Sequence, residues 1–299
     1  MSEHGCNEEL EKLKKRKSAA DDLFRICCKT DRPYHRYELP TRIIFKDILD
    51  TYKELLQLLE SDSVHTAPVL LRTVLEKLIH LEFICQDENL YELKSKAWLY
   101  NYVKNRTRGA ALFTNKSQTG KEFEKYFIEK YGAPPSQNLI NFDDPENHGK
   151  WREWERVKED LAKELIDEIT KFQKNTQTKG SEKKSSANAK KETAPDPWYN
   201  LWNDCKGIEQ LSKQVKLWDY YQIFYRRWSE AVHGSDIDNI ISETQEGYLR
   251  WGVENVEEKM SEYCEYANQL LSMACRNIYQ KVLDHDERQE IPKSFNNMD

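Results

Sequence analysis

The chain has 299 residues, a third of them charged, with a formal net charge of −6 and a mean hydropathy of −0.89. Its apolar runs are too short to cross a bilayer, and no apolar signal segment opens the chain, so the sequence predicts a soluble protein without a membrane anchor. The negative charge argues against a dedicated duplex-DNA binder, because phosphate neutralisation supplies most of such a protein's affinity. An enzyme that contacts RNA briefly, through a local basic patch, remains open.

The seven cysteines show neither zinc-site nor disulfide-framework spacing, although Cys27 and Cys28 are adjacent. Without an export signal we expect reduced thiols and a cytoplasmic location. The sequence contains no phosphate-binding loop, no dinucleotide-binding glycine motif and no zinc-protease motif, so no cofactor and no metal are expected. The acidic segment 143–148 could bind a cation, but its composition is more typical of a polar turn.

Helical periodicity dominates the chain. Residues 1–40 are expected to form a charged N-terminal helix or extension, frayed over residues 1–20, and residues 41–283 a single helical domain. Helices are predicted over 43–60 and 65–85, with Pro68 near the start of the second, where helices tolerate proline. Apolar residues recur there every three or four positions: Ile44, Ile48, Thr51, Tyr52, Leu55 and Leu59, then Leu71, Val74, Leu75, Leu78 and Leu81.

The middle of the chain is predicted to be a loop-rich helical insertion at about 105–175, followed by a disordered linker at 176–197. Glycine and proline are frequent in 105–150, and a third helical stripe follows. The linker has no large apolar residue with which to offset its ordering entropy. The aromatic segment 198–202 after it is interpreted as re-entry of the chain into the core. The stripe comprises Trp151, Trp154, Leu161, Leu165, Ile169 and Phe172.

The C-terminal part is predicted to contain one helix of about ten turns, from Leu249 to Val282, followed by a flexible tail at 284–299. An amphipathic helix of that length must pack against others. The sequence therefore predicts an all-α fold, a helical bundle with an insertion and an internal linker.

The segment 217–235 combines a predicted apolar stripe with residues capable of phosphodiester chemistry. On a regular helix, Arg226 and His233 lie on one ridge, two turns apart, while Arg227 lies to one side. Gly234 suits a helix C-terminal cap, which places His233 in the last turn. Ser229 and Glu230 flank the ridge. The opposite face carries the stripe of Leu217, Tyr221, Phe224, Trp228 and Val232.

An arginine and a histidine at this spacing suit the cleavage of a phosphodiester. The guanidinium of Arg226 can hold a phosphate and stabilise charge in the transition state. The imidazole of His233 titrates near neutrality, so it can move a proton to or from a ribose hydroxyl. Such a pair also arises by chance on a solvated helix face, and that alternative stays open.

A second group lies on the predicted helix 65–85, where Arg72 and Glu76 are four residues apart and His80 continues the same row. A surface salt bridge worth a few tenths of a kcal/mol is the simpler interpretation of Arg72 and Glu76. The functional interpretation is a supporting shell for a site on the segment 217–235.

These two segments together resemble the HEPN superfamily, in particular a prokaryotic branch with an early LLRxxxE helix and a late YRxxSxxVHG helix. The motifs read LLRTVLE from Leu70 to Glu76 and YRRWSEAVHG from Tyr225 to Gly234. The resemblance covers about 41–90 and 198–283. It implies a helical bundle, usually a homodimer, and in many members a metal-independent endoribonuclease of toxin–antitoxin or anti-phage systems. Either Arg226 or Arg227 satisfies the family spacing.

The resulting hypothesis is a homodimeric HEPN-like endoribonuclease. Arg226, with Arg227 as the alternate, would bind the scissile phosphate, His233 would be the general acid and base, and Ser229 would position the phosphate or the histidine. Arg72 and Glu76 would support them. RNA is the expected substrate, and an antitoxin or defence protein a further partner. The alternative is a non-catalytic helical scaffold that binds a partner, as inactive members of the superfamily do.

Overall fold

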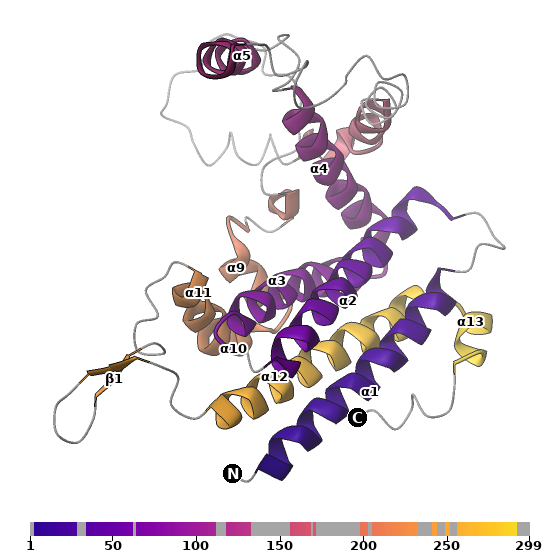
Figure 1. Ribbon diagram of the computed structural model, residues 1–299. Helices are drawn as coiled ribbons and strands as arrows, with labels where there is room; N and C mark the ends of the chain where they lie inside the picture. Colours follow the sequence, from indigo (N-terminus) through magenta and orange to yellow (C-terminus); the bar gives the residue numbers. More distant parts are fainter. Residues whose placement is uncertain are drawn as a thin grey trace. The chain divides into compact units, whose positions relative to one another are not determined.

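The computed structural model of the chain describes residues 3–28, 34–61, 64–111, 118–132, 156–168, 170–171, 198–202, 205–232, 241–243, 249–251 and 256–291 (Figure 1). The chain divides into two compact units. The first combines Met1–Glu92 with Gly207–Asp299, and the second is Leu93–Lys206. No helix within the described residues is both long enough and apolar enough to cross a membrane.

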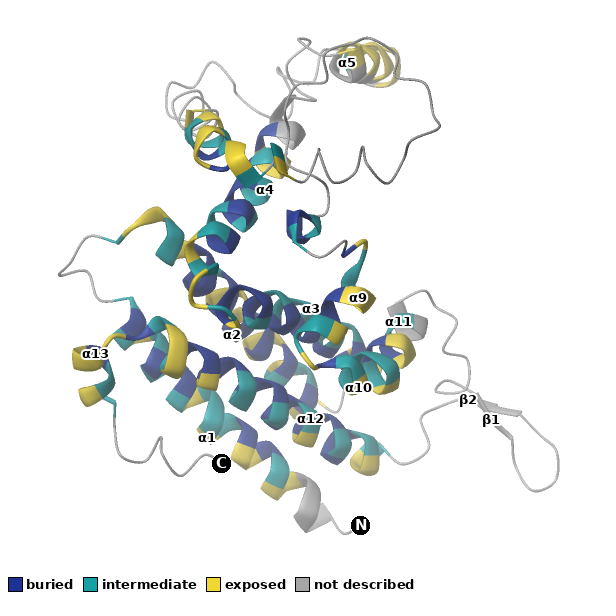
Figure 2. Cartoon of the chain, turned by 180° about the vertical axis from the view of Figure 1, so that it is seen from behind, coloured by how far each residue is buried: buried dark blue, intermediate teal, exposed yellow. Residues whose placement is uncertain are grey.

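The first unit is built on a closed ring of four helices, α1 (Glu3–Cys27), α2 (Leu39–Glu60), α3 (Ala67–Cys85) and α12 (Val256–Asn277). Helix α1 packs against α2 and α12, and α3 packs against the same two helices (Figure 1). The buried residues of these helices gather where they face one another (Figure 2). The predicted all-α helical bundle is therefore confirmed.

Helices α2 and α3 follow the predicted periodicity. Pro68 occupies the first turn of α3, where the helix loses no hydrogen bond to it. Tyr52 on α2 is completely buried, and its hydroxyl donates to the carbonyl of Ala267 on α12. This bond satisfies the one polar atom of a large core side chain. All the predicted stripe residues are buried: Ile44, Ile48, Thr51, Tyr52, Leu55, Leu59, Leu71, Val74, Leu75, Leu78 and Leu81.

Helix α1 corrects the expectation of a frayed, charged N-terminal segment. Its charged residues lie on the outer face, where ion pairs such as Lys17–Asp21 form along the helix. Arg16 donates to the carbonyl of Asn268 on α12 at 2.9 Å. The expectation was wrong because the many charges obscure a regular apolar stripe, whose members are all buried: Leu10, Leu13, Ala20, Leu23 and Cys27.

The C-terminal helix begins later than predicted. Leu249 belongs to strand β2 (Leu249–Trp251), which pairs antiparallel with β1 (Ile241–Glu243) in the register Ile241↔Trp251. Helix α12 starts at Val256 and continues into a π-helical turn, η5 (Ile278–Val282). The two strands form a small ladder beside an otherwise helical fold.

The predicted flexible tail starts with an ordered element, α13 (His285–Gln289). Asp284 caps this helix, because its carboxylate accepts from the Glu287 N–H at 2.8 Å while the Glu287 carboxylate accepts from the Asp284 N–H at 2.9 Å. Glu287 is buried. Residues 292–299 lie outside the described part of the chain.

The second unit contains α4 (Tyr91–Ala111) from Leu93 onward, α5 (Gln118–Tyr131), the 3₁₀ turn η2 (Trp198–Leu201) and a helical segment at 156–164. Gly109 and Gly120 lie inside α4 and α5 rather than in loops, so this part of the predicted insertion is more helical than expected. Lys96 on α4 forms an ion pair of 2.8 Å with Glu164. The helical segment at 156–164 therefore packs beside α4.

The third predicted stripe is described only in part. Leu161 and Leu165 are buried, as expected, and Trp198, Tyr199 and Leu201 are buried too, which confirms re-entry of the chain into the core after the linker. The remaining stripe residues, the acidic segment 143–148 and the predicted linker 176–197 lie outside the described residues; those stripe residues are Trp151, Trp154, Ile169 and Phe172.

Candidate active site

The two helices that carry the motifs meet in the first unit. The late motif begins within a composite helix of α10 (Trp218–Tyr220), a π-helical turn η3 (Tyr221–Tyr225) and α11 (Arg226–Val232). Both η3 and α11 pack against α3, which carries the early motif. The short helix α9 (Ile208–Gln214) packs on α3 as well. The predicted proximity of the motif helices, about 150 residues apart in sequence, is confirmed.

The π-helical turn changes which residues face α3. In η3 the Arg226 N–H donates to the Tyr221 carbonyl, five residues back, so the turn holds one residue more than a regular helix. Tyr225 is consequently buried against the bundle, whereas Phe224 is only half-buried. The predicted stripe assumed about 100° per residue throughout, so it left out Tyr225, while its members Tyr221 and Phe224 are only half-buried. Such π-helical insertions are frequent at functional sites.

Tyr225 joins the two residues of the early motif. Arg72 Nη2 donates to the Tyr225 hydroxyl at 2.9 Å, and the hydroxyl in turn donates to the Glu76 carboxylate. Arg72 Nη2 also lies 3.2 Å from Glu76 Oε1, and the guanidinium carbon lies 4.7 Å from the centre of the Tyr225 ring. Arg72 and Glu76 are thus part of a three-residue cluster between helices, and more than the surface salt bridge of the simpler interpretation.

The cluster continues into a stack of aromatic rings along η3. The ring of Tyr221 lies parallel to Tyr225 at 4.8 Å and to Trp218 at 5.6 Å, measured between ring centres. Lys213 Nζ lies 3.9 Å from the Trp218 ring, so a cation stands at each end of the stack. Ammonium and guanidinium groups are attracted to the faces of such rings. The stack fixes the position of η3 and of the α11 residues that follow it.

The two adjacent arginines have different surroundings. Arg226 is exposed, and its Nη1 donates to Gln222 Oε1 at 3.3 Å. Arg227 Nη1 lies 3.7 Å from Glu262 Oε1 on α12. The guanidinium of Arg227 thus reaches a neighbouring helix. Of the two, Arg226 presents its guanidinium to solvent with only a neutral hydrogen-bond partner among the described residues.

Arg226 is not in contact with Arg72 among the described residues, but both lie near one tyrosine. Burial raises the pKa of Tyr221, Glu209 adds to the increase, and Arg226 and Arg72 oppose it. Tyr221 is therefore within electrostatic range of both guanidinium groups. Glu76 pairs with Arg72, one turn before it on α3.

Ser229 has a more limited role than expected. Its hydroxyl donates to the Tyr225 carbonyl at 2.6 Å, so its only proton is committed to the backbone. The oxygen can still accept a hydrogen bond. This arrangement suits contact with a protonated imidazole or a guanidinium, and it does not suit donation to a phosphate oxygen.

His233 and Gly234 lie outside the described residues, because the description of α11 ends at Val232. The side chain of Glu230 is likewise outside it. His80, which continues the row of Arg72 and Glu76, is described: burial lowers its pKa to about 4. His80 is therefore neutral at physiological pH and is not suited to exchange protons there.

The aromatic residues of the cluster were not among the predicted catalytic residues. Tyr225 opens the late motif, and Trp218, Tyr221 and Tyr225 recur at helical spacing. Of these three residues, only Tyr221 was assigned to the predicted apolar stripe, and Tyr225 was noted as the first residue of the late motif. The spacing of the tyrosines could have indicated a stack. The pairing of Tyr225 with Arg72, however, depends on the π-helical turn, which the sequence does not predict.

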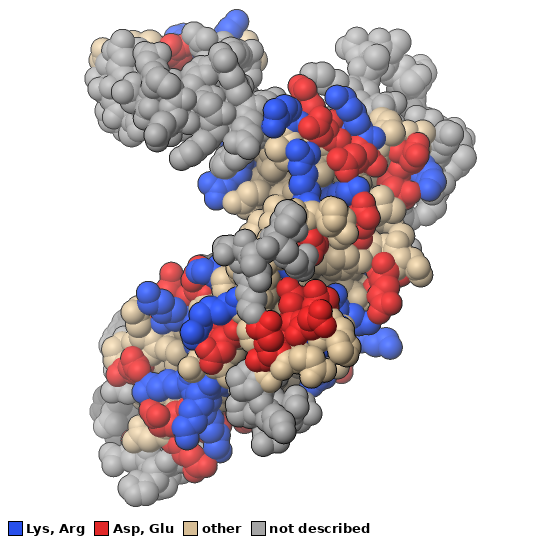
Figure 3. All heavy atoms as spheres, turned by 90° about the vertical axis from the view of Figure 1, so that its right-hand side faces the viewer, with Lys and Arg blue, Asp and Glu red and all other residues tan. Residues whose placement is uncertain are grey.

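Charge on the surface is mixed. On the face shown in Figure 3, Lys and Arg side chains are interspersed with Asp and Glu side chains. A nucleic acid would therefore be held on this face by local contacts rather than by a continuous basic surface.

Within the part of the chain that the structure describes, no three His, Cys, Asp or Glu side chains are grouped to hold a metal ion.

Tyr225→Phe is expected to destabilise the first unit by about 1.5 kcal/mol, because it removes a hydroxyl that bonds to two charged groups and keeps the stacked ring. The control is Tyr221→Phe, whose hydroxyl has no hydrogen-bond partner among the described residues and which should change stability much less. Urea unfolding of the full chain measures both. Equal effects of the two substitutions would show that the Tyr225 hydroxyl contributes nothing.

The same hydroxyl gives this difference in stability a pH dependence. Burial, together with the Glu76 carboxylate, raises the pKa of Tyr225 to about 12, although Arg72 opposes the increase. The folded protein thus holds the phenolic proton more tightly than the unfolded chain, in which the pKa is about 10. The stabilising contribution is fully present below pH 10 and is lost as the pH rises toward 12. The difference in unfolding free energy between the wild type and Tyr225→Phe should therefore decrease over that pH range.

Comparison with known proteins places the chain in a family. The model of a family of unknown function, DUF5677, matches residues 39–248, which include α2, α3 and the whole segment from α9 to β1. No curated protein and no solved structure matches the chain. Since the family model covers well over half of the sequence, the protein belongs to the DUF5677 family.

Proposed function

We propose that the protein is a metal-independent, HEPN-like endoribonuclease that acts as a homodimer in the cytoplasm, as a toxin or an anti-phage effector. The observation that supports this best is the meeting of the two motifs. Arg72 and Glu76 of the early motif bond to Tyr225, the residue immediately before Arg226. The composite site expected from the sequence requires the two motifs to lie close together. Motifs on opposite sides of the molecule would have contradicted it.

In the proposed reaction, Arg226 binds the scissile phosphate and His233 takes the proton from the adjacent ribose 2′-hydroxyl. The 2′-oxygen attacks phosphorus, the bond to the 5′-oxygen breaks, and the leaving oxygen receives a proton from the imidazolium of His233. The products are a 2′,3′-cyclic phosphate and a 5′-hydroxyl end. The cluster of Arg72, Glu76 and Tyr225 holds the start of α11, and so the position of Arg226.

A non-catalytic scaffold is the second candidate, and one observation favours it. Arg72 and Arg227 are each paired with a carboxylate of the same chain, Glu76 and Glu262. Such pairs form in the folded chain without any substrate, so the positions of Arg72 and Arg227 do not require an RNA ligand. In that case Arg226 would be a solvated surface residue.

Total RNA incubated with the full chain in EDTA distinguishes the two candidates. The wild type should cleave the RNA and leave cyclic phosphate ends, and His233→Ala should not, because it removes the proton-transfer group. His285→Ala is the matched control, since His285 is exposed on α13 and lies far beyond the late motif in sequence. Circular dichroism should show all three proteins folded. Absence of cleavage by the wild type, or equal cleavage by His233→Ala, would contradict the proposal.

A further inference from the structure

The C-terminal end of α1 places two thiols side by side at the edge of the core. Cys27 is the last residue of α1 and is completely buried, whereas Cys28 directly follows it and is partly accessible. Cys85, Cys205, Cys264 and Cys275 are buried as well. Cys28 is thus the accessible thiol among the described cysteine side chains, and it has a second thiol as its immediate neighbour.

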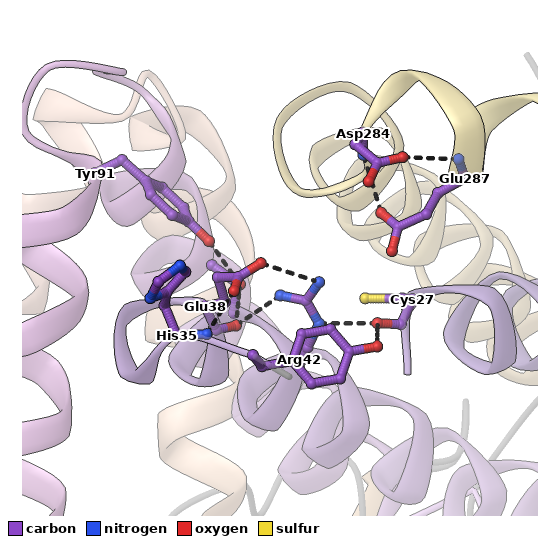
Figure 4. A network of polar contacts seen from close by, with 9 residues as sticks. Cys27, His35, Glu38, Arg42, Tyr91, Asp284 and Glu287 are labelled. Carbon is purple, nitrogen blue, oxygen red and sulfur yellow. Dashed lines mark hydrogen bonds and ion pairs between the residues drawn. The ribbon is translucent and has the colours of Figure 1, made fainter. Parts of the chain in front are cut away.

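A buried arginine organises the backbone at this point (Figure 4). Arg42 Nε donates to the Cys27 carbonyl at 2.8 Å, and the Tyr34 hydroxyl donates to the same oxygen at 3.2 Å. Arg42 Nη1 donates to the carbonyl of Glu38, at the end of the 3₁₀ turn η1 (Arg36–Glu38), at 2.9 Å. Arg42 is only 4% exposed, so its charge acts through a medium that screens it weakly.

One nitrogen of this arginine is incompletely satisfied. Arg42 Nη2 is buried without a hydrogen-bond partner among the described residues, and its nearest carboxylate oxygen, Glu38 Oε1, is 3.8 Å away. A buried guanidinium with a spare N–H favours an anion nearby. The thiolate of Cys28 is such an anion.

The two thiols differ in acidity. A hydrogen bond from Cys27, together with the charge of Arg42, lowers the pKa of Cys28 to about 7, while burial and Glu287 oppose the change. The hydrogen bond to Cys28 and burial raise the pKa of the Cys27 thiol above its usual range. Cys28 is therefore the nucleophilic thiolate near neutral pH, and Cys27 remains a protonated neighbour.

We propose that Cys27 and Cys28 form a modification site for hydrogen peroxide, at which the pair is oxidised to a vicinal disulfide. The Cys28 thiolate attacks one peroxide oxygen, the O–O bond breaks, and the released hydroxide takes a proton to become water. Cys28 is now a sulfenic acid. The Cys27 sulfur then attacks the Cys28 sulfur, the S–O bond breaks, and water leaves with the Cys27 proton. The two sulfurs lose two electrons, and the peroxide gains them.

The product is expected to be reversible and to disturb the end of α1. Neighbouring Cα atoms are about 3.8 Å apart, below the range of about 4.4–6.8 Å for ordinary disulfides, so the bond is strained and easily reduced. Closing it requires the backbone at Cys27 and Cys28 to move. The Cys28 N–H bond to the Phe24 carbonyl, 3.0 Å in the reduced protein, and the contacts of Arg42 and Tyr34 with the Cys27 carbonyl would be weakened.

The test uses the full chain treated with stoichiometric hydrogen peroxide at neutral pH, followed by digestion and mass spectrometry. The peptide that contains residues 27 and 28 should lose two hydrogens and regain them with dithiothreitol. Peptides with the buried Cys85, Cys264 and Cys275 serve as internal controls and should stay reduced. The melting temperature of the oxidised protein should fall and recover with the same reductant.

Two variants separate the roles of the thiols. Cys28→Ser should prevent the reaction at this peptide, and Cys27→Ser should stop it at a sulfenic acid on Cys28, which dimedone traps. The digest of the wild type does not depend on whether these variants fold. The proposal is overturned if residues 27 and 28 stay reduced while the buried cysteines oxidise, or if Cys28 instead links two copies of the chain. Either result is independent of ribonuclease activity.

Discussion

Arg226→Ala is expected to reduce RNA cleavage by about 100- to 1,000-fold, the usual effect of removing one group that stabilises a charged transition state. Arg227→Ala should leave most of the activity. Seven helical residues advance about 700°, which returns Arg226 to within about 20° of His233, whereas six residues leave Arg227 about 120° away. The structure supports this choice, because Arg226 starts the α-helical part of the segment and Arg227 is directed to Glu262 on α12.

Initial rates of cleavage in EDTA measure the ranking, with Arg227→Ala as the matched control for Arg226→Ala. The exposed ion pair of Arg227 with Glu262 is worth about 0–1 kcal/mol, so both variants should remain folded at room temperature. Greater loss of activity in Arg227→Ala would show that Arg227 turns inward, for example across a dimer. Unchanged activity in both variants would remove the arginines from the proposed mechanism.

Leu13→Ala is expected to destabilise the first unit by about 2–5 kcal/mol, a large part of the stability of an ordinary domain. Leu13 is completely buried on α1, which packs against α2 and α12, so the truncation leaves a cavity in the ring of four helices. Leu39→Ala deletes the same atoms from a side chain that is 36% exposed and should cost much less. The shift of the urea unfolding midpoint measures both variants.

Similar midpoints for the two leucine variants would mean that α1 is an extension and not a part of the core. The contribution of α1 to stability also bears on the boundaries of the family. The matched region, residues 39–248, contains α2 and α3 but neither α1 nor α12. If Leu13→Ala is as damaging as expected, a fragment limited to the matched region would lack two of the four helices of its bundle.

The sequence predicted the bundle where apolar residues stand out from their surroundings. The stripes of α2 and α3 are regular and strongly apolar, so periodicity alone located both helices and their buried faces. The stripe of α1 is equally regular, but lysine and glutamate on its outer face led to the expectation of a frayed helix. Leu249 continues the spacing of α12 by coincidence, and pairing with β1 places it in a strand instead.

The candidate site was predicted in part. Arg72 and Glu76 were placed correctly beside the late motif, although they bond there to Tyr225 and not to the predicted polar ridge of Arg226. Tyr225 was not predicted as their link, since one additional residue in a π-helical turn rotates everything after it relative to a regular helix. Whether His233 completes the site stays a prediction.

The pairing of α1 with α12 has a consequence for synthesis on the ribosome. The first and last long helices are neighbours in the ring, so the bundle cannot close until Val256–Asn277 has emerged. Between the end of α3 at Cys85 and the start of α12, translation at about 5–20 residues per second takes roughly 10–30 s. During that interval α1 and α3 each expose the apolar face that α12 finally covers.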